Sequence, residues 1–522
     1  MSKIDFSNAG HASGVLSATL QLGNVKSTLA LVASLFMAYC AAQTIYRIWF
    51  HPLSKFPGPP LLAAVYIPYV YLNHVRGVWV RRLPGLHRKY GPAVRVGPNH
   101  IAFDGSIGWQ EVYGHRKNGQ KEFSKQPVAF PGDEKNLLHA PLDVHRRQRR
   151  QLSYAFSDSS LIRQESTICK YIDMLMERLW ERAKQDQVVD IVEWLNFTTF
   201  DIIGDLTFSD SFHSLENNGY HPWVRSIFKA VRGIALRRGY NLYPMIRSIV
   251  DVLNLNSISK ATLQIRGYAK EKTKVRIGLG EEPVEGHKDF ITYMMRKTPK
   301  EGTGMSAEEI IATTPTLVLA GSETTATALS GFTFLMSKNP RVYAIVANEI
   351  RSTYSAESDI TIRNTAAIEY LQAVIDETLR VYPPAAETPP RVCPGAMVDG
   401  KYIPAGARVS VSQWATFHNP DNFVEPEAFL PERWLTKSHP RYEERFQADN
   451  KAVFKPFSYG SRDCIGKNLA QVEMRYIIAR LLYRFDFELA SPQENWLASQ
   501  RVFVLWDKGP LYLRLRPRKM HV

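Results

Sequence analysis

The chain has 522 residues, of which 45% are hydrophobic, so it is long and apolar enough for a large core. Lysine and arginine number 65 against 50 aspartates and glutamates, and the formal net charge is +15. Because this charge is spread along the chain without a compact nucleic-acid motif, a membrane surface or an acidic protein partner is favoured over nucleic acid. The four cysteines, at 40, 169, 393 and 464, lie far apart and indicate neither a zinc cluster nor a disulfide framework.

The first predicted element is an apolar run over residues 27–46, bracketed by Lys26 and Arg47. Its twenty uncharged, mostly apolar positions span a bilayer core at helical rise. A cleaved signal peptide is the alternative, but its apolar part is usually shorter and nearer the N-terminus. We expect a tail over residues 1–26, a transmembrane anchor over 27–46 and a stiff proline-rich hinge over 47–60, followed by one catalytic domain over 61–522.

The beginning of the globular part predicts a small β region. From about residue 78, short alternating runs such as 93–96 and 100–103 read as strands, separated by Gly-Pro steps. Residues 126–141 have little periodicity and are predicted to form a loop.

Three helical stretches follow in the first half of the chain. His145 and Arg149 share one face of a helix predicted to reach Phe156, although an arginine-rich segment of this kind is by itself more typical of a solvated surface. Residues 193–212 are rich in aromatics and predict a core helix. Residues 220–260 mix basic and aromatic side chains, which indicates either helices lying on an anionic bilayer or an ordinary surface pair. Residues 278–288 predict a linker.

A long helix is predicted in the centre of the chain. Ser306 and Glu309 have the spacing of a capping box, and an apolar run extends from there to about Met336. Its interior contains Ala320-Gly321-Ser322-Glu323-Thr324-Thr325. The small residues would let a bulky flat cofactor press against the helix, and an acid followed by an alcohol is unusual enough in a mostly apolar helix to need a reason. Alternatively, the hydroxyl groups bond back to carbonyls of their own helix.

Charged residues at the end of a later helix form a second motif. Glu377 and Arg380 are three apart on one helix face, which is ordinarily a weak surface pair. Residues 382–391 contain four prolines and are predicted to be non-helical, while 401–403 and 409–412 predict strands.

Cys464 is in a glycine-punctuated loop near the C-terminus. It follows Arg462 by two residues and precedes a long apolar run, 465–482, that predicts a helix. Gly460 and Gly466 permit backbone conformations closed to other residues and a close approach of a flat ligand. A position just before a helix N-terminus lowers the pKa of a thiol, which points to a presented thiolate. The alternative is a buried free cysteine with a structural role only.

These motifs, in this order, resemble those of the cytochrome P450 family over essentially the whole chain. The match to the family's haem-binding signature is Phe457-x-x-Gly460-x-Arg462-x-Cys464-x-Gly466. Residues 320–325 resemble its oxygen-binding motif, and Arg433 in Pro431-Glu432-Arg433-Trp434 is similar to the arginine that joins Glu-x-x-Arg. The sequence is most similar to those of fungal secondary-metabolism enzymes such as trichothecene hydroxylases.

The resemblance implies a role for each matching residue. Haem b would be the cofactor, with the Cys464 thiolate as the fifth ligand of its iron. Arg149 and Arg391 would bind the two propionates, and His145 replaces the family's usual tryptophan. The residues implied to contact the cofactor are Cys464, Arg462, Phe457, Gly466, Arg149, His145, Arg391, Ala320 and Gly321.

The remaining implied roles concern protons and structural support. Thr324 would hydrogen-bond oxygen or water above the iron, and Glu323 would relay protons from solvent. Glu377, Arg380 and Arg433 would be buried together and brace the cysteine loop. The loop with Glu387 would line the pocket, where this carboxylate contacts a polar substrate group or, as the favoured alternative, faces solvent.

The implied fold is mainly α with a small β region, anchored by one N-terminal transmembrane helix in the endoplasmic reticulum with the catalytic domain in the cytoplasm. The implied activity is insertion of one atom of dioxygen into a lipophilic secondary metabolite such as a terpenoid, polyketide or alkaloid. Electrons would come from NADPH-cytochrome P450 reductase, with cytochrome b5 as an optional partner, since no flavin or nicotinamide fingerprint is present. The rivals are a haem-thiolate isomerase, dehydratase or peroxide-dependent enzyme, and a haem sensor.

Overall fold

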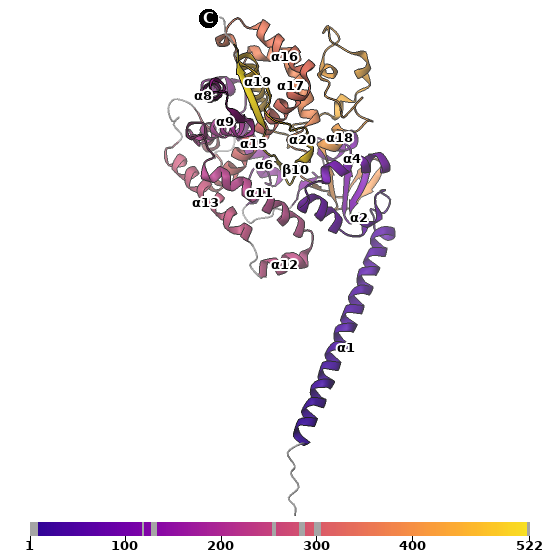
Figure 1. The fold of residues 1–522 in the computed structure, drawn as a ribbon. Coiled ribbons are helices and arrows are strands. Elements are labelled where there is room, and N and C mark those ends of the chain that lie inside the picture. Colours follow the sequence, from indigo (N-terminus) through magenta and orange to yellow (C-terminus); the bar gives the residue numbers. More distant parts are fainter. Residues whose placement is uncertain are drawn as a thin grey trace, which may run out of the picture.

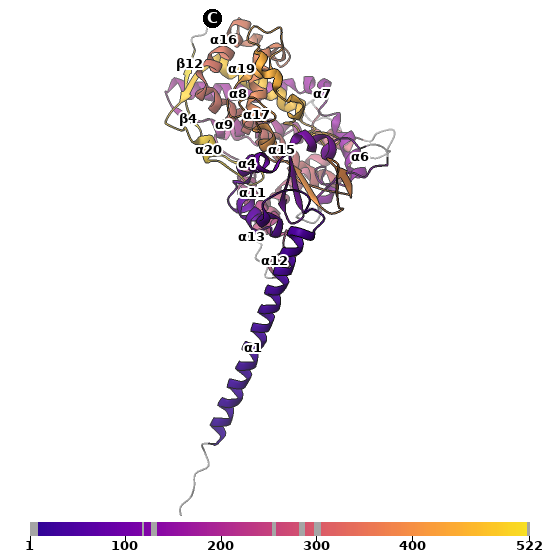
Figure 2. The same cartoon turned by 90° about the vertical axis from the view of Figure 1, so that its right-hand side faces the viewer.

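The computed structural model describes residues 9–116, 119–126, 133–252, 257–280, 288–296 and 304–518. Its first helix, α1 (Ala9–Ile45), continues through a π-helical turn, η1 (Tyr46–Phe50), and projects from the body as a rod (Figures 1 and 2). The segment Ser27–Phe50 has a mean hydropathy of 1.6 and none of its most apolar window is buried. By length and composition this helix is able to cross a membrane. The helical turn also extends into the predicted hinge as far as Phe50.

The rest of the predicted hinge packs against the body. Leu53 and Phe56 are buried, and the Pro57 carbonyl accepts a hydrogen bond from the Arg95 backbone N–H at 2.8 Å. The Arg95 guanidinium donates in turn to the Arg47 carbonyl at 2.7 Å. These contacts fix the position at which α1 leaves the globular part.

A five-stranded sheet forms the β region, in the order β1-β2-β8-β5-β3. The strands β2 and β8 run parallel, and the other neighbours are antiparallel. Their bounds are β1 Ala93–Gly97, β2 His100–Phe103, β8 Arg408–Val411, β5 Arg391–Val392 and β3 Ser124–Lys125. The strands predicted at 93–96, 100–103 and 409–412 are thereby confirmed, and Arg391 lies directly opposite Lys125 in the register.

The strand prediction is wrong between residues 79 and 90. This segment is the helix α4 (Trp79–Tyr90), which carries Pro84 in its interior. Its buried side chains Trp79, Leu83 and His87 are four apart and therefore lie on one helix face. Burial of this stripe stabilises the helix in spite of the proline.

The long central helix, α15 (Ala307–Lys338), is the core of the helical part. Its capping box is formed as predicted, with the Ser306 hydroxyl accepting from the Glu309 N–H and the Glu309 carboxylate accepting from the Ser306 N–H. It packs along α9 (Ile191–Phe208), whose residues are almost all buried, and also contacts α17 (Glu369–Val381) and α19 (Lys467–Arg484). The core role predicted for residues 193–212 is confirmed.

The other elements cover this core. The larger helices are α6 Leu142–Ser153, α8 Glu165–Lys184, α11 Pro222–Tyr240, α12 Pro244–Val252, α13 Ser257–Gly278 and α16 Pro340–Thr353. The short helices are α2 Pro60–Ala64, α3 Ile67–Val70, α5 Gly105–Gly108, α7 Asp158–Arg163, α10 Ser214–Asn217, α14 Phe290–Met295, α18 Gln413–Phe417 and α20 Trp496–Ser499. The remaining strands pair as β4 Val188–Asp190, β12 Tyr512–Pro517 and β9 Phe485–Leu489, as β6 Ala396–Val398 and β7 Lys401–Ile403, and as β10 Arg501–Val502 and β11 Trp506–Asp507.

Several predictions of local structure can be checked against these bounds. The helix predicted to reach Phe156 ends at Ser153, and residues 382–390 are non-helical as predicted. Of the predicted loop 126–141, residues 127–132 lie outside the described residues, as do residues 281–287 of the predicted linker.

Candidate functional site

The loop that carries Cys464 precedes α19 by a short turn. A backbone hydrogen bond joins Cys464 to the start of this loop. The Cys464 N–H donates to the Phe457 carbonyl at 2.9 Å, and the Cys464 side chain is exposed. Gly460 has a φ of +84°, and a Cβ atom there would lie 2.0 Å from the Tyr113 carbonyl oxygen. Only glycine fits that position. Gly466 has a φ of −87°, so the special conformation predicted for it is wrong, but it leaves the space beside the loop open.

The electrostatics of Cys464 differ from the prediction. Although the thiol is accessible, protein surrounds it closely enough that burial raises its pKa, and the Asp463 carboxylate raises it further. The Gly466 N–H, Arg149 and Lys467 oppose the rise. The helix N-terminus therefore does not produce a thiolate by itself, and a metal cation at the sulfur would supply the missing stabilisation.

One face of α15 is open in the middle of an otherwise buried helix. Ala320 is exposed, Thr316 and Thr324 are half-buried, and the three are four residues apart. By contrast Val318 and Ser322, on other faces, are fully buried. This open stripe is a surface against which a flat cofactor fits.

Thr324 and Gly321 make contacts that the motif alone does not show. The Thr324 hydroxyl donates to the Ala320 carbonyl at 2.6 Å, so it bonds back to its own helix. A Cβ atom on Gly321 would lie 2.6 Å from Ile203 Cδ1, so glycine here allows close packing of α15 on α9. The structure thus relates Gly321 to helix packing and places Ala320 on the open face.

A buried cluster of positive groups lies between the sheet and the cysteine loop. Arg391 and Lys125 are paired across β5 and β3, and Arg462 is 91% buried. Arg462 Nε donates to Glu122 Oε1 at 2.6 Å, while Arg391 Nη1 lies 3.9 Å from the same oxygen. A single carboxylate therefore serves two guanidinium groups.

The pKa values of this cluster are shifted by burial and, to a smaller extent, by its own charge. Burial, followed by the charges of Arg391 and Arg462, holds the pKa of Lys125 well below its ordinary value. Burial lowers the pKa of His145 to about 3, with contributions from Arg462 and Arg149. Among the described residues, Arg391 Nε and Nη1 and His145 Nδ1 have no hydrogen-bond partner.

These unsatisfied donors and mutually repelling cations fit an anionic cofactor. Buried charges normally remain only when they are paired. The two carboxylates of haem would pair with them, next to a thiol and an open helix face. Arg149 is placed differently: it donates to the Asp463 carbonyl at 2.6 Å and pairs with the Asp463 carboxylate, so it ties α6 to the cysteine loop.

Glu323 is not open to solvent. Its side chain is 2% exposed and forms an ion pair with Lys508, which is 4% exposed. Thr327, one turn further along α15, donates to Glu323 Oε1 at 3.3 Å. The acid and Thr324 are thus neighbours in sequence whose side chains make separate contacts.

Glu377, Arg380 and Arg433 come together in one buried network, as predicted. Each of their side chains is 0% exposed. The Glu377 carboxylate accepts from Arg380 Nε at 2.9 Å and from Arg433 Nε at 3.1 Å, and Arg433 Nη1 also bonds Asp449 at 2.6 Å. The network joins α17 to the segment that leads into the cysteine loop.

Sequence reasoning missed Lys125, Glu122 and Lys508. None belongs to a motif, and the signal that reveals each is a contact between segments distant in sequence. Glu387, for which a solvent-facing position was favoured, is only half-exposed. Burial raises its pKa to about 7, and Arg408 opposes the rise.

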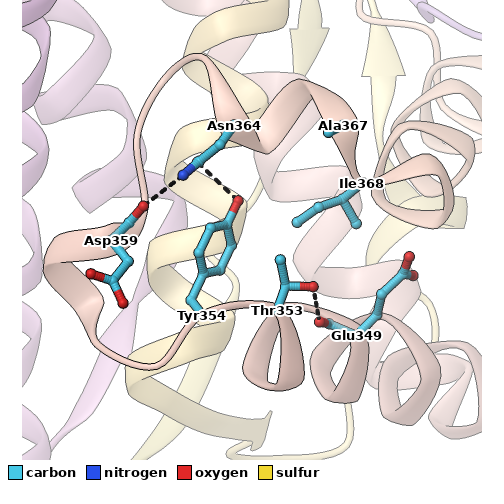
Figure 3. A pocket seen from close by; sticks show the side chains of 7 residues that line it. All are labelled: Glu349, Thr353, Tyr354, Asp359, Asn364, Ala367 and Ile368. Carbon is cyan, nitrogen blue, oxygen red and sulfur yellow. Dashed lines mark hydrogen bonds between the residues drawn. The ribbon is translucent and has the colours of Figure 1, made fainter.

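The described chain also contains a surface pocket away from these residues. It has a volume of about 410 Å³ and is lined by α16 and the following turns (Figure 3). The Tyr354 hydroxyl donates to Asn364 Oδ1 at 3.0 Å, and Asn364 donates to the Asp359 carbonyl at 2.6 Å. Since these polar groups satisfy one another and no predicted site residue lines it, the pocket is not part of the site.

A mainly helical fold with one presented cysteine, an open central helix and a buried cationic cluster defines the class of haem-thiolate proteins. The model of the family described as Cytochrome P450 matches residues 57–514. The chain is 39% identical over 484 residues to cytochrome P450 monooxygenase astJ of Aspergillus oryzae, covering 92% of this chain and 95% of that protein. It is 36% identical to the trichothecene C-15 hydroxylase of Fusarium sporotrichioides, covering 94% and 98%, and 36% identical to the trichothecene C-4 hydroxylase of Trichoderma arundinaceum, covering 94% and 97%.

The chain therefore belongs to the cytochrome P450 family. It is a monooxygenase of the kind found in fungal secondary metabolism, and its cofactor is haem b. Such enzymes need a reductase as redox partner and act on lipophilic substrates.

Proposed function

We propose that this protein inserts one oxygen atom, by hydroxylation or epoxidation and in one or more successive steps, into a lipophilic terpenoid, polyketide or alkaloid of a biosynthetic pathway. The observation that carries the proposal is the exposed Cys464 thiol in a site where two buried guanidinium groups share one carboxylate and Arg391 has donors without a hydrogen-bond partner among the described residues. The naming of two relatives as trichothecene hydroxylases makes a terpenoid the first class to test.

Each predicted site residue has a proposed role toward the cofactor. Cys464 would ligate the iron of bound haem, and the cofactor would supply the reductive activation of dioxygen. The donors of Arg391 and His145 hold the propionates, and Lys125 adds charge to the same cluster. Arg149 keeps the cysteine loop in place through Asp463, while Phe457, Arg462 and Gly466 shape the loop around the cofactor.

Thr324 and Glu323 are proposed to move protons on the open side of α15. The Thr324 hydroxyl has to leave the Ala320 carbonyl in order to donate toward substrate or water, which costs about one hydrogen bond. Glu323, whose Oε2 has no hydrogen-bond partner among the described residues, passes a proton to that hydroxyl through water in this proposal, after its own exchange with solvent.

We further propose that residues 27–46 anchor the protein in the endoplasmic reticulum with the catalytic domain in the cytoplasm. In both views α12 lies at the end of the body from which α1 emerges (Figures 1 and 2). Met245, Ile249 and Val252 on α12 are exposed by 75%, 54% and 82%. Exposed apolar side chains gain free energy when they move from water into lipid. This face therefore supports contact with the bilayer surface.

The electron donor is proposed to be NADPH-cytochrome P450 reductase, with cytochrome b5 as an optional second donor. Lys467 at the start of α19 is an exposed cation beside the cysteine loop, and Arg146 is an exposed cation on α6, the helix whose Arg149 pairs with Asp463 of that loop. Such a face suits an acidic partner. Replacing both by glutamate is expected to raise the reductase concentration needed for half-maximal reduction.

The central test is a carbon-monoxide difference spectrum of the reduced full-length protein. The wild type is expected to show the red-shifted thiolate band, and Cys464→Ala is expected to lose it. Cys393→Ala, which changes a buried thiol of the β region, is the matched control and is expected to keep it. A thiolate band that survives Cys464→Ala overturns the ligand assignment.

The activity is tested with the reductase, NADPH and a panel of terpenoids, polyketides and alkaloids, scored by mass for addition of one oxygen atom. Thr324→Ala is expected to lower product formed per NADPH consumed by about tenfold or more. Thr333→Ala, which removes a buried hydroxyl of the same helix that bonds the Ser330 carbonyl, is expected to leave this ratio unchanged. Equal ratios in both variants would contradict the role of Thr324, and isomerised product without oxygen addition would favour the rival class.

A further inference from the structure

Lys508 and Glu323 form a buried ion pair that no motif of the sequence includes. The ammonium group contacts Glu323 Oε1 and also donates to the Thr327 hydroxyl at 2.6 Å. The Thr327 hydroxyl donates in turn to the same carboxylate oxygen, Glu323 Oε1, at 3.3 Å. The second oxygen, Glu323 Oε2, is buried and has no hydrogen-bond partner among the described residues.

The segment that carries Lys508 is fixed on both sides. It lies between β11 and β12, and the Trp506 indole N–H donates to the Pro383 carbonyl at 2.8 Å. The Trp496 indole N–H donates to the Gly509 carbonyl at 3.0 Å, and the Leu511 N–H donates to Asp190 Oδ1 at 3.0 Å. With its backbone held in this way, the lysine presents its ammonium group in one place.

The charge of Glu323 also affects tyrosines packed around it. Burial raises the pKa of Tyr382, at the end of α17, and the Glu323 carboxylate adds to that rise. Burial raises the pKa of Tyr220 as well, with smaller contributions from Glu193 and Glu323. Both tyrosines therefore stay neutral, and Lys508 is the group that directly compensates the carboxylate.

We propose that Lys508 is a positioning residue for the proton supply: its ammonium group pairs with Glu323 Oε1 and holds that oxygen beside the Thr327 hydroxyl, which leaves Glu323 Oε2 as the oxygen that exchanges a proton. The inference rests on the proposed roles of Glu323 and Thr324. In this arrangement Glu323 Oε2 accepts one proton from a hydronium ion of the solvent, which becomes water, and then gives that proton to a water molecule on the Thr324 side, so that the carboxylate is restored. A buried carboxylate needs a cation and hydrogen-bond donors beside it, and Lys508 together with Thr327 supplies both.

The substitution Lys508→Met removes the cation and keeps most of the side-chain volume. An isolated carboxylate in this buried place takes up a proton. Infrared spectroscopy of the full-chain holoenzyme in its resting state is expected to show an additional protonated-carboxyl band in the difference spectrum of Lys508→Met minus wild type, and the double variant Lys508→Met/Glu323→Gln is expected to lack this additional band. Lys508→Arg keeps the charge and is expected to lack the band.

Two further measurements separate a positioning role from a purely structural one. Lys508→Met is expected to lower product formed per NADPH to the level of Glu323→Gln, and Lys508→Arg is expected to restore it at least in part. Arg516→Met, which removes a surface cation of β12 that pairs with Glu488, is the matched control and is expected to change neither the band nor the ratio. If Lys508→Met misfolds, the comparison of Lys508→Arg with Lys508→Gln replaces it.

The outcomes distinguish this inference from the proposed function. If Glu323→Gln lowers the ratio and Lys508→Met does not, the proton role of Glu323 stands and the inference about Lys508 is overturned. If Glu323→Gln leaves the ratio unchanged, the proposed proton role fails and the inference fails with it. Absence of the carboxyl band in Lys508→Met likewise overturns the inference.

Discussion

The substitution Arg380→Met tests the buried network most directly. Arg380 donates five hydrogen bonds, two to Glu377 and three to backbone carbonyls, those of Phe417, Pro426 and Ala428. Each buried carbonyl left without a donor costs about 1–3 kcal/mol. Removing one partner of a buried ion pair costs about 3–5 kcal/mol. Part of this cost is already contained in the cost of the unpaired carbonyl groups. We expect the free energy of unfolding to fall by about 5 kcal/mol, comparable with the whole stability of many domains.

Pulse proteolysis of the full chain in urea, scored together with the fraction that binds haem, measures this loss. The matched control is Arg445→Met, which removes the same side chain from exposed pairs with Glu425 and Glu443. Surface pairs of this kind contribute at most about 1 kcal/mol. If Arg380→Met and Arg445→Met lower the free energy of unfolding equally, the buried network contributes no more to stability than an exposed pair, and the reasoning is refuted.

Two further predictions follow from the loop and from a buried histidine. Gly460→Ala places a Cβ atom 2.0 Å from the Tyr113 carbonyl at a φ of +84°, so haem incorporation should be lost, whereas Gly466→Ala meets only an ordinary contact of 3.7 Å and should preserve the loop. Burial beside Arg380 lowers the pKa of His418 to about 3. Because the unfolded chain binds this proton near pH 6.5, stability should fall as the pH drops from 6.5 towards 3, by up to about 1.4 kcal/mol per pH unit. His418→Phe should remove that part of the acid slope in urea midpoints, and an unchanged slope would contradict it.

What could be predicted from the sequence was mostly local. The capping box of α15 needs only two residues three apart, and the strands at 93–97 and 100–103 follow from alternation and the turn between them. The helix α4 does not follow from local propensity, since it contains Pro84 and Gly85, and its stability comes from burial of Trp79 and Leu83 against other elements. Local propensity gave no sign of that packing.

The site was predictable where a role depends on one residue type in one motif. The network of Glu377 and Arg380 formed as expected. Its members belong to motifs that occur in a fixed order along the chain and can be found in the sequence. The partner of Glu323 is 185 residues away, and nothing near Lys508 marks it as buried. In the same way Lys125 becomes part of the cationic cluster only through its register opposite Arg391.

The cationic cluster also explains how the cofactor and the fold depend on each other. Arg391 and Arg462 are buried beside the carboxylate of Glu122, and the half-buried Lys125 lies opposite Arg391. Burial, followed by the charges of Arg391 and Arg462, lowers the pKa of Lys125, so the protein alone bears a cost of desolvation and repulsion there. A dianionic cofactor pairs with these charges only in the folded state, and ligands that bind only the folded state stabilise it by mass action. The haem propionates would therefore stabilise the fold at the same residues that position the iron, so that charge-neutralising substitutions such as Arg391→Met should weaken cofactor retention more than they weaken the apoprotein.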